Sequence, residues 1–217
     1  MANVVPTSLL FDFRPRLSRC SGPTKKKTGR LLSLPDAATL FQPSSVNDSV
    51  VYASLRLGWN EDGLGGELTV AGRTAPPQGD VTKLDTTDSL SVWLDTRPSG
   101  IVHRATEYCH SFGFVPATES GGPQAVVLPI AQQRASRIES NVKLFSLRTQ
   151  STTTGYTLEF WIPGTQLHGF REITEFGRLG FHAVVQDSEL GEQSFSLADD
   201  FPTSYDPSTW TQLELQT

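Results

Sequence analysis

Short runs in which apolar and other side chains alternate recur along this chain. The clearest is Asp88–Asp95, where Leu90, Val92 and Leu94 share one face of an extended chain and a carboxylate closes the run. Later segments repeat this arrangement. Alternation with a period of two is typical of a half-buried strand, and the closing acid places a carboxylate in the loop that follows.

About ten short strands are predicted in this way, with glycine and proline turns between them. They lie at residues 9–14, 50–59, 66–73, 90–95, 102–115, 126–128, 142–147, 155–163, 179–185, 194–197 and 210–215. Residues 50–73 form a predicted hairpin with a long glycine-rich tip, and residues 164–170 a single helical turn. The pattern predicts an all-β fold, an antiparallel β-sandwich of the jelly-roll or immunoglobulin-like kind with at most short helical turns.

Length and composition agree with a single β domain. The chain has 217 residues, of which 37% are hydrophobic, with 18 Gly and 14 Pro, and these numbers favour many strands and turns over long helices. We expect residues 36–217 to form one sandwich. Residues 1–35 are expected to be a basic segment that contains a first strand and is part of the domain or packed on it.

The charge is unevenly spread, although the net charge is only −5. Residues 1–35 hold seven basic residues and one acid, whereas the rest of the chain holds 11 basic and 22 acidic residues. An acidic body argues against nucleic acid as the main partner. The basic segment either lies as a solvated loop against its own acidic body or contacts a phosphate or an acidic polymer.

Four motifs, in this order, resemble the family 9 carbohydrate-binding modules and the related DOMON-like sandwiches. They are Asp88–Asp95, Gly155–Pro163, Gly180–Asp187 and the closing Asp206–Leu215. The resemblance covers residues 37–215. It implies a β-sandwich that binds a saccharide without catalysis, and it leaves the individual ligand unnamed.

The resemblance also implies where a sugar would bind, and the chain departs from the family there. The family grips the sugar between two aromatic rings. Asp85 and its neighbours stand where the first ring is expected, and Tyr205 is the nearest match to the second. A family acid becomes Ser91, while Arg104 matches a family arginine on the following strand. We therefore expect a kept scaffold with a diverged or lost sugar site.

Three tryptophans are candidates for contact with a ligand, because a flat ring covers a sugar face through C–H contacts. Trp93 and Trp161 point away from the apolar faces of their strands. They either share one exposed surface or lie covered beneath the N-terminal segment. Trp59 precedes a polar turn, which predicts exposure. The candidate ligand-binding residues are Arg104, Tyr205, Trp59, Ser91 and Trp93.

Metal and catalytic sites are predicted less clearly. Asp95 and Asp187 are candidates for a structural calcium ion, since loop carboxylates suit Ca²⁺ and related sandwiches often hold one. Cys109, with the histidines beside it, matches no zinc spacing. The chain has no Gly-x-Ser-x-Gly, P-loop or His-Glu-x-x-His motif, so we expect a protein that is not an enzyme.

The cysteine count and the targeting signals bear on the cellular compartment and on the partner. Two cysteines, Cys20 and Cys109, are too few for a disulfide framework. No signal peptide or membrane-spanning run is visible, which predicts a cytoplasmic protein without a membrane partner, or a secreted one if a leader has been trimmed. Two functions remain open: saccharide binding, or docking of a protein partner by an intracellular structural domain.

Overall fold

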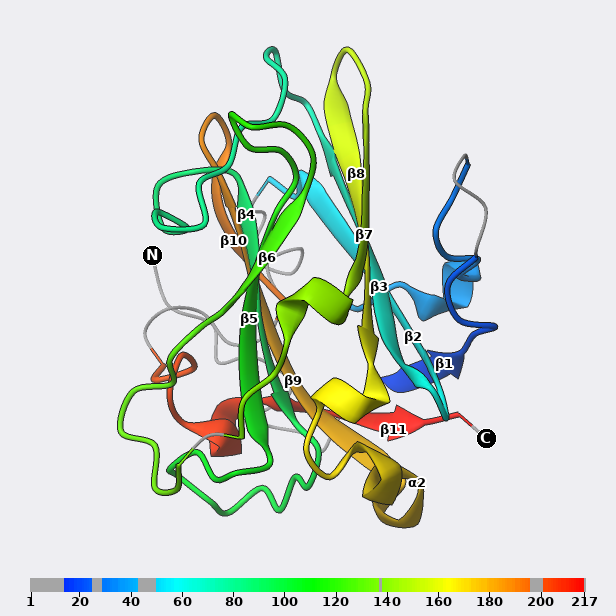
Figure 1. Ribbon diagram of the computed structural model, residues 1–217, viewed down its shortest axis with the longest axis vertical. Helices are drawn as coiled ribbons and strands as arrows, with labels where there is room; N and C mark the ends of the chain where they lie inside the picture. The colour runs from blue at the N-terminus through cyan, green and yellow to red at the C-terminus, as the bar shows by residue number, and fades with distance from the viewer. Residues whose placement is uncertain (1–13, 25–28, 43–49, 137, 196–200, 217) are drawn as a thin grey trace.

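The computed structural model describes residues 14–24, 29–42, 50–136, 138–195 and 201–216. The described strands are β1 (Arg16–Arg19), β2 (Ala53–Asn60), β3 (Gly63–Ala71), β4 (Ser89–Asp95), β5 (Cys109–Val115), β6 (Gln124–Val127), β7 (Ser146–Ser151), β8 (Gly155–Pro163), β9 (Arg178–Asp187), β10 (Gly191–Ser194) and β11 (Thr211–Leu215) (Figure 1). One short α-helix, α2 (Ile173–Phe176), accompanies them. Single 3-10 turns lie at η1 (Asp36–Ala38), η3 (Val142–Leu144), η4 (Gly164–Gln166), η5 (Phe170–Glu172) and η6 (Pro207–Thr209). Within these ranges no helix is long and apolar enough to cross a membrane.

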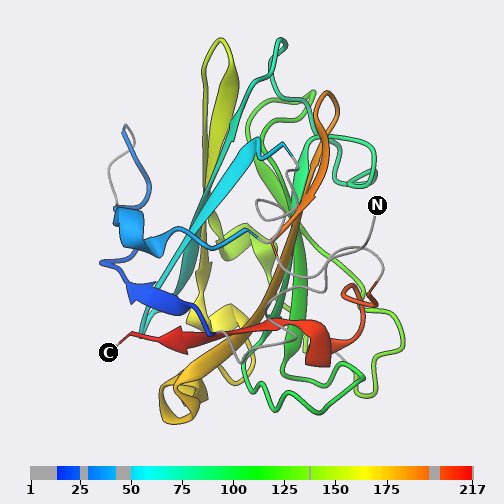
Figure 2. The ribbon, with the colours of Figure 1, turned by 180° about the vertical axis from the view of Figure 1, so that it is seen from behind.

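The strands form one nearly closed, barrel-like sheet that folds into two facing layers. The strand order is β6-β5-β4-β9-β11-β1-β2-β3-β8-β7, and β10 pairs with β9. Strand β1 joins the layers, because it runs parallel both to β11 and to β2 (Figure 2). The all-β prediction is confirmed, and its purely antiparallel form is wrong at β1. The jelly-roll or immunoglobulin-like topology stays a prediction.

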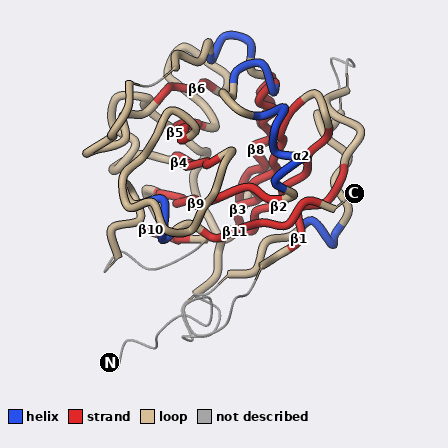
Figure 3. The backbone as a smooth tube through the Cα atoms, turned by 90° about the horizontal axis from the view of Figure 1, so that it is seen from below, coloured by secondary structure: helices blue, strands red, loops and turns tan. Residues whose placement is uncertain are grey.

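The core lies between the layers, where the apolar faces of the strands meet (Figure 3). The predicted inward residues of β4 (Leu90, Val92 and Leu94) and of β8 are completely buried. Phe114 stacks on Phe160 across this core with ring centroids 4.5 Å apart. Alternation therefore identified correctly which side of each strand faces the interior.

Several predicted element boundaries are wrong. The predicted strand at residues 102–115 begins only at Cys109, because the preceding residues turn, with the amide of Cys109 donating to Thr106 O. Residues 142–144 form η3, and the strand β7 follows them. The glycines placed in a hairpin tip belong to β3, which pairs with β2 from Gly63 onward. The predicted strand at residues 9–14 lies almost wholly outside the described residues.

Gly63 and Gly65 of β3 are explained by what covers the outer face of this strand. A Cβ atom on Gly65 would lie 2.7 Å from the ring of Trp161 and 2.8 Å from Leu32, closer than packed atoms tolerate. Trp161 packs there with Leu31, Leu32 and other residues of the segment 29–38. We call this segment, which follows the basic stretch, the N-terminal strap. Trp161 is thus covered, which was one of the two alternatives left open by the sequence.

A buried carboxylate fastens the N-terminal strap to the sheet. Glu159 on β8 is only 2% exposed, and its two oxygens accept hydrogen bonds from the backbone amides of Leu31 and Leu32 at 2.8 and 2.9 Å. Arg148 and Gln150 on β7 donate to Gly29 O nearby. Arg19 and Arg30 pair with Glu61 and Glu67 of the body. The described part of the basic segment therefore lies against its own acidic domain.

Glu159→Ala is expected to loosen the N-terminal strap and to expose Trp161. The loss of two charge-assisted acceptors leaves the Leu31 and Leu32 amides without partners, which destabilises the fold by about 1–3 kcal/mol. Hydrogen exchange of these two amides and a red shift of tryptophan emission measure the change. Glu61→Ala, at an exposed ion pair, is the matched control and should leave both signals unchanged. Unaltered exchange in Glu159→Ala would contradict the strap's attachment through this carboxylate.

Candidate functional site

The outer face of β4 carries a row of side chains that point away from the core. Ser89, Ser91, Trp93 and Asp95 form this row, since they alternate with the buried leucines and valine. On the neighbouring strand β9, the register sets His182 opposite Trp93. These two strands therefore present a mixed polar and aromatic surface outside the core.

A cavity of about 470 Å³, which we call the Ser91 cavity, lies on this surface. Residues of β4, β9, β10 and three loops line it. They are Val81, Thr82, Leu84, Asp85, Ser89, Ser91, Trp93, Leu128, His182, Val184, Gln186, Glu192, Phe201, Thr203 and Ser204. Its size suits a small ligand, and its lining mixes apolar surface with hydroxyl, amide and carboxylate groups. No lysine or arginine is present among these lining residues.

Trp93 and His182 form the inner end of this lining. Their ring centroids lie 5.0 Å apart with an interplanar angle of 35°. The indole Nε1–H of Trp93 is buried and has no acceptor among the described residues. Burial lowers the pKa of His182 to about 3, so its imidazole is neutral near pH 7. These two rings therefore give the cavity an uncharged aromatic surface.

The structure brings together several residues that the sequence had singled out. Ser91 and Trp93 line the Ser91 cavity, and so does Asp85, which stands where the family places a ring. Tyr205 does not line it. It packs, as Trp93 does, against a small apolar group that we call the Trp210 cluster: Ala105, Cys109, Ile130 and Trp210. Thr203 and Ser204, just before Tyr205, do reach the cavity.

Two of the predicted site residues lie elsewhere. Arg104 belongs to the exposed loop before β5, and its Nε donates to Gln132 O at 3.2 Å. It was expected on the strand itself. Trp59 is only 2% exposed, because the alternation of β2 sets it on the core side together with Leu55 and Leu57. Its place in the strand, rather than the neighbouring turn, determines its burial.

A shared tryptophan surface is also ruled out by the arrangement of the strands. Trp93 lies on β4 and Trp161 on β8, and these strands belong to opposite layers of the fold (Figure 3). Sequence reasoning missed His182, Gln186 and Thr203. The alternation of residues 178–187 already set the first two on the outward face of their strand, so that signal was available. No local pattern marked Thr203.

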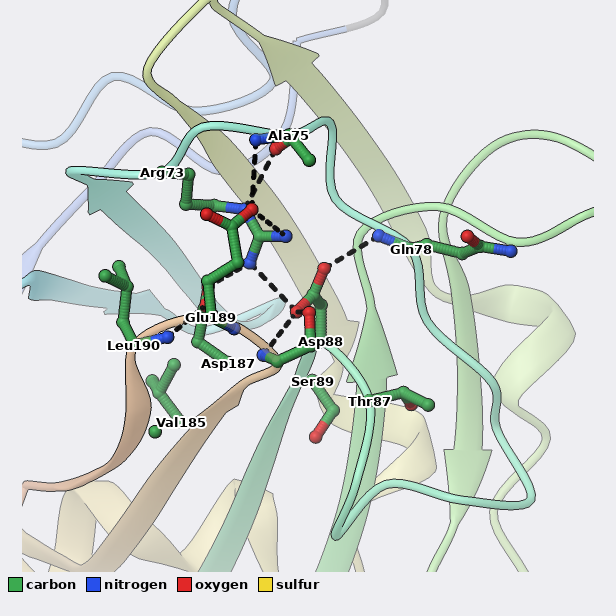
Figure 4. Close-up of polar contacts among 12 residues, drawn as sticks. Arg73, Ala75, Gln78, Thr87, Asp88, Ser89, Val185, Asp187, Glu189 and Leu190 are labelled. Atoms are coloured by element: carbon green, nitrogen blue, oxygen red, sulfur yellow. Dashed lines mark hydrogen bonds and ion pairs between the residues drawn. The ribbon is translucent and has the colours of Figure 1, made fainter.

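Asp187, a sequence-predicted calcium candidate, forms an ion pair with an arginine of the protein. The guanidinium of Arg73 lies between Asp88 and Asp187, and these three side chains are at most 2% exposed (Figure 4). Arg73 Nη1 donates to Asp88 Oδ1 at 2.9 Å and also to Asp187 Oδ2. Glu189 pairs with Nη2 at 3.3 Å. The arginine therefore pairs with Asp187, one of the two calcium candidates, and calcium binding there stays a sequence-based prediction.

The other calcium candidate, Asp95, stands apart from further acidic ligands. Its Oδ1 accepts a hydrogen bond from the Arg97 amide at 2.9 Å. Among the described residues no group of three or more His, Cys, Asp or Glu side chains is placed to hold a metal ion. The two cysteines, Cys20 and Cys109, are free thiols. Calcium binding at Asp95 stays a sequence-based prediction.

One serine, histidine and aspartate do meet, at the N-terminus of η6. His103 Nδ1 lies 3.0 Å from both Asp206 Oδ2 and Ser208 Oγ, and Ser208 Oγ donates to Asp206 Oδ1 at 2.6 Å. A nucleophile relay needs the serine and the acid on opposite ring nitrogens. Here both contact the same nitrogen, and Asp206 also caps η6 through the Ser208 amide. The group is a capping arrangement.

Comparisons with known proteins bear on the fold. No family model matches the sequence, and no curated protein matches it. A carbohydrate-binding module of family 9 from Caldicellulosiruptor kristjanssonii, in complex with cellotriose, matches with a TM-score of 0.60, 13% identity and 94% of both chains covered. A family 9 module from the same organism in complex with glucose matches with a TM-score of 0.58 and 13% identity, over 94% of this chain and 96% of that chain. The resemblance predicted from the four motifs is confirmed: this chain has the fold of the family 9 carbohydrate-binding modules.

Proposed function

We propose that this protein is a non-catalytic carbohydrate-binding module that takes a neutral saccharide in the Ser91 cavity. One observation supports the proposal most directly. The outward residues Ser91 and Trp93 of β4 line the same cavity as Asp85, although the resemblance assigned positions 85 and 91 to the family's sugar site from sequence alone. The site is thus proposed to be diverged in its residues while its place in the fold is kept.

The chemistry of the lining favours a neutral ligand. Asp85 and Glu192 are acidic, and the described lining residues include no lysine or arginine. An anionic sugar would meet like charge there, which is unfavourable at short range. Hydroxyl and amide groups, including Ser91 and Gln186, both donate and accept, as sugar hydroxyls do. The Trp93 indole adds an apolar surface.

The proposal of a non-enzymatic protein has separate support. Glycoside hydrolysis needs two carboxyl groups that face each other across the scissile bond. Both acids of the cavity are exposed. Asp85 lies in the loop before β4, and Glu192 lies on β10. Binding without catalysis is therefore the function that the cavity supports best.

The alternative function, docking of a protein partner, receives less support from the described residues. That alternative used either a face of the sandwich or the basic segment as the docking surface. In the described part of that segment, the leucines instead pack against Trp161, and two backbone amides donate hydrogen bonds to Glu159. A segment used in this way covers the sheet of its own domain.

Titration calorimetry, guided by a glycan array, tests the proposal. We expect weak binding of a neutral saccharide, with a dissociation constant in the range of about 10 μM to 10 mM, abolished in Ser91→Tyr because the ring fills the cavity. Trp93→Ala should weaken binding by at least about tenfold, in line with the loss of one stacked ring.

The matched control is Arg104→Ala, an exposed change outside the cavity, which should bind as the parent protein does. Circular dichroism and the unfolding midpoint verify that each variant is folded. A glycan array without any hit would overturn the proposal. So would binding that survives Ser91→Tyr unchanged, since the saccharide would then occupy another place.

A further inference from the structure

A second cavity, of about 480 Å³, opens at the other end of the outward row on β4. We call it the Asp95 cavity; it is lined by Asp95, Arg97, Pro98, Ser99, Val102, Thr106, Glu107, Tyr108, Phe176 and Arg178. Asp95 lies four residues beyond Ser91, which is about 13 Å along a strand. The Trp210 cluster, which includes Cys109 opposite Asp95, lies beside Trp93 on the face between them. The two cavities share no lining residue.

Asp95 is an unusual carboxyl for a structural position. It is only 6% exposed, and its sole hydrogen bond among the described residues comes from the Arg97 amide to Oδ1. It makes no ion pair in the described chain, although two arginines line the same cavity. Burial raises the pKa of Asp95 to about 6, against the opposing effect of the Arg97 amide. A desolvated acid without a counter-ion, beside open space, is typical of a ligand site.

The two arginines of the Asp95 cavity are held in place by other groups. The Arg97 guanidinium lies 5.0 Å from the Tyr108 ring centroid and 5.1 Å from that of Phe176, and it donates to the Tyr108 hydroxyl at 3.0 Å. Arg178 Nη1 donates to Gln212 Oε1 at 3.1 Å, while its Nε–H is buried without an acceptor in the described chain. Both guanidinium groups keep N–H donors beyond these contacts. Their fixed positions reduce the entropy lost on binding.

The charge balance indicates the class of ligand. Arg97 and Arg178 offset Asp95 and Glu107, so the lining carries no net formal charge. An anion would meet two carboxylates, and a cation two guanidinium groups. A hydroxyl group both donates and accepts, which suits a carboxylate next to an arginine. The rings of Tyr108 and Phe176 are covered by Arg97, so recognition here is polar.

We propose that the Asp95 cavity is a second binding site, which binds a vicinal diol of a neutral saccharide or polyol. Asp95 accepts a hydrogen bond from this diol, and Arg178 donates one to it. One hydroxyl donates to the carboxylate, and its neighbour accepts from the guanidinium. This site does not depend on the Ser91 cavity, and either can exist without the other.

Nuclear magnetic resonance separates the two sites in the full chain. The arginine Nε–H signals of Arg97 and Arg178 report on the Asp95 cavity, and the indole signal of Trp93 reports on the Ser91 cavity. The probes are methyl α-mannopyranoside and methyl β-glucopyranoside, with sodium glucuronate and sodium sulfate as anionic comparisons. We expect a neutral glycoside to shift the two arginine signals, and Asp95→Asn to weaken this binding by at least about tenfold. Ser91→Tyr is the matched control and should leave it unchanged.

Three results would overturn the second site. The first is a shift of the arginine signals by sulfate or glucuronate alone, which would make the cavity an anion site. The second is the absence of a shift with either glycoside at tens of millimolar. The third is binding that persists in a folded Asp95→Asn variant, which would remove Asp95 from recognition. Loss of the Trp93 response with the arginine response intact would count against the Ser91 cavity only.

Discussion

Arg73→Met is expected to lower the free energy of unfolding by about 3–5 kcal/mol, the loss typical of breaking a buried ion pair from one side. The substitution keeps an apolar stem and removes the only cation that contacts Asp88 and Asp187 among the described residues. Both carboxylates would then be buried without a counter-charge. Chemical denaturation followed by circular dichroism measures the effect.

The Arg73 network should have this large effect because it joins distant parts of the fold. Arg73 follows β3, Asp88 precedes β4, and Asp187 ends β9, so the contacts tie the two layers together at one end (Figure 4). Asp88 also accepts from the Ser188 and Gln78 amides at 2.8 and 2.7 Å. These amides hold the Asp88 carboxylate in place even after the arginine is gone.

Two variants make the Arg73 result specific. Arg19→Met removes an exposed pair with Glu61 and should change the unfolding midpoint little. Arg73→Lys keeps the charge, but its single ammonium nitrogen replaces both Nη1, which contacts the two aspartates, and Nη2, which pairs with Glu189, so its effect should fall between the parent and Arg73→Met. A midpoint in Arg73→Met as high as that of Arg19→Met would show that the network does not stabilise the fold.

Asp95→Asn is expected to stabilise the protein by about 1–3 kcal/mol at pH 7.5 and to have little effect at pH 4. Burial raises the pKa of Asp95 to about 6, above its ordinary value of 3.8, so the folded protein holds this proton more tightly than the unfolded chain. Between these two pH values the ionised carboxylate becomes a growing destabilising contribution. Two pKa units correspond to about 3 kcal/mol, which sets the upper end.

The free energy of unfolding, measured as a function of pH, checks this prediction. The stability that protonated Asp95 contributes is complete below about pH 4 and is lost as the pH rises through 6. The difference between Asp95→Asn and the parent should therefore grow over this range and level off above it. Asparagine still accepts from the Arg97 amide, so the local turn is kept. A difference that is flat from pH 4 to 7.5 would contradict a raised pKa at this position.

A stabilising Asp95→Asn would also sharpen the test of the second binding site. Loss of glycoside binding in a variant that is more stable than its parent does not come from unfolding. Residues that bind ligands are often retained at the expense of stability. Together the two measurements separate a functional carboxyl from a structural one.

Local alternation in the sequence was enough to predict the strands and the core. Leu90, Val92 and Leu94 are buried because every second residue of a strand points the same way, and one face must leave water. The same rule set Ser91 and Trp93 outside, where the Ser91 cavity lies. It failed where a turn interrupts a run, as before Cys109, since turn geometry depends on hydrogen bonds such as that to Thr106 O.

Tertiary structure alone decided what covers each outward face. Trp93 and Trp161 occupy equivalent places in similar sequence patterns, yet Trp161 is buried under the N-terminal strap and Trp93 lines a cavity. Arg73 and Asp187 are 114 positions apart in the chain and meet in one ion cluster. A period of two is a property of a few neighbouring residues, so the sequence determined which side each side chain takes. The partner on that side comes from chain segments far away, which only the folded arrangement brings together.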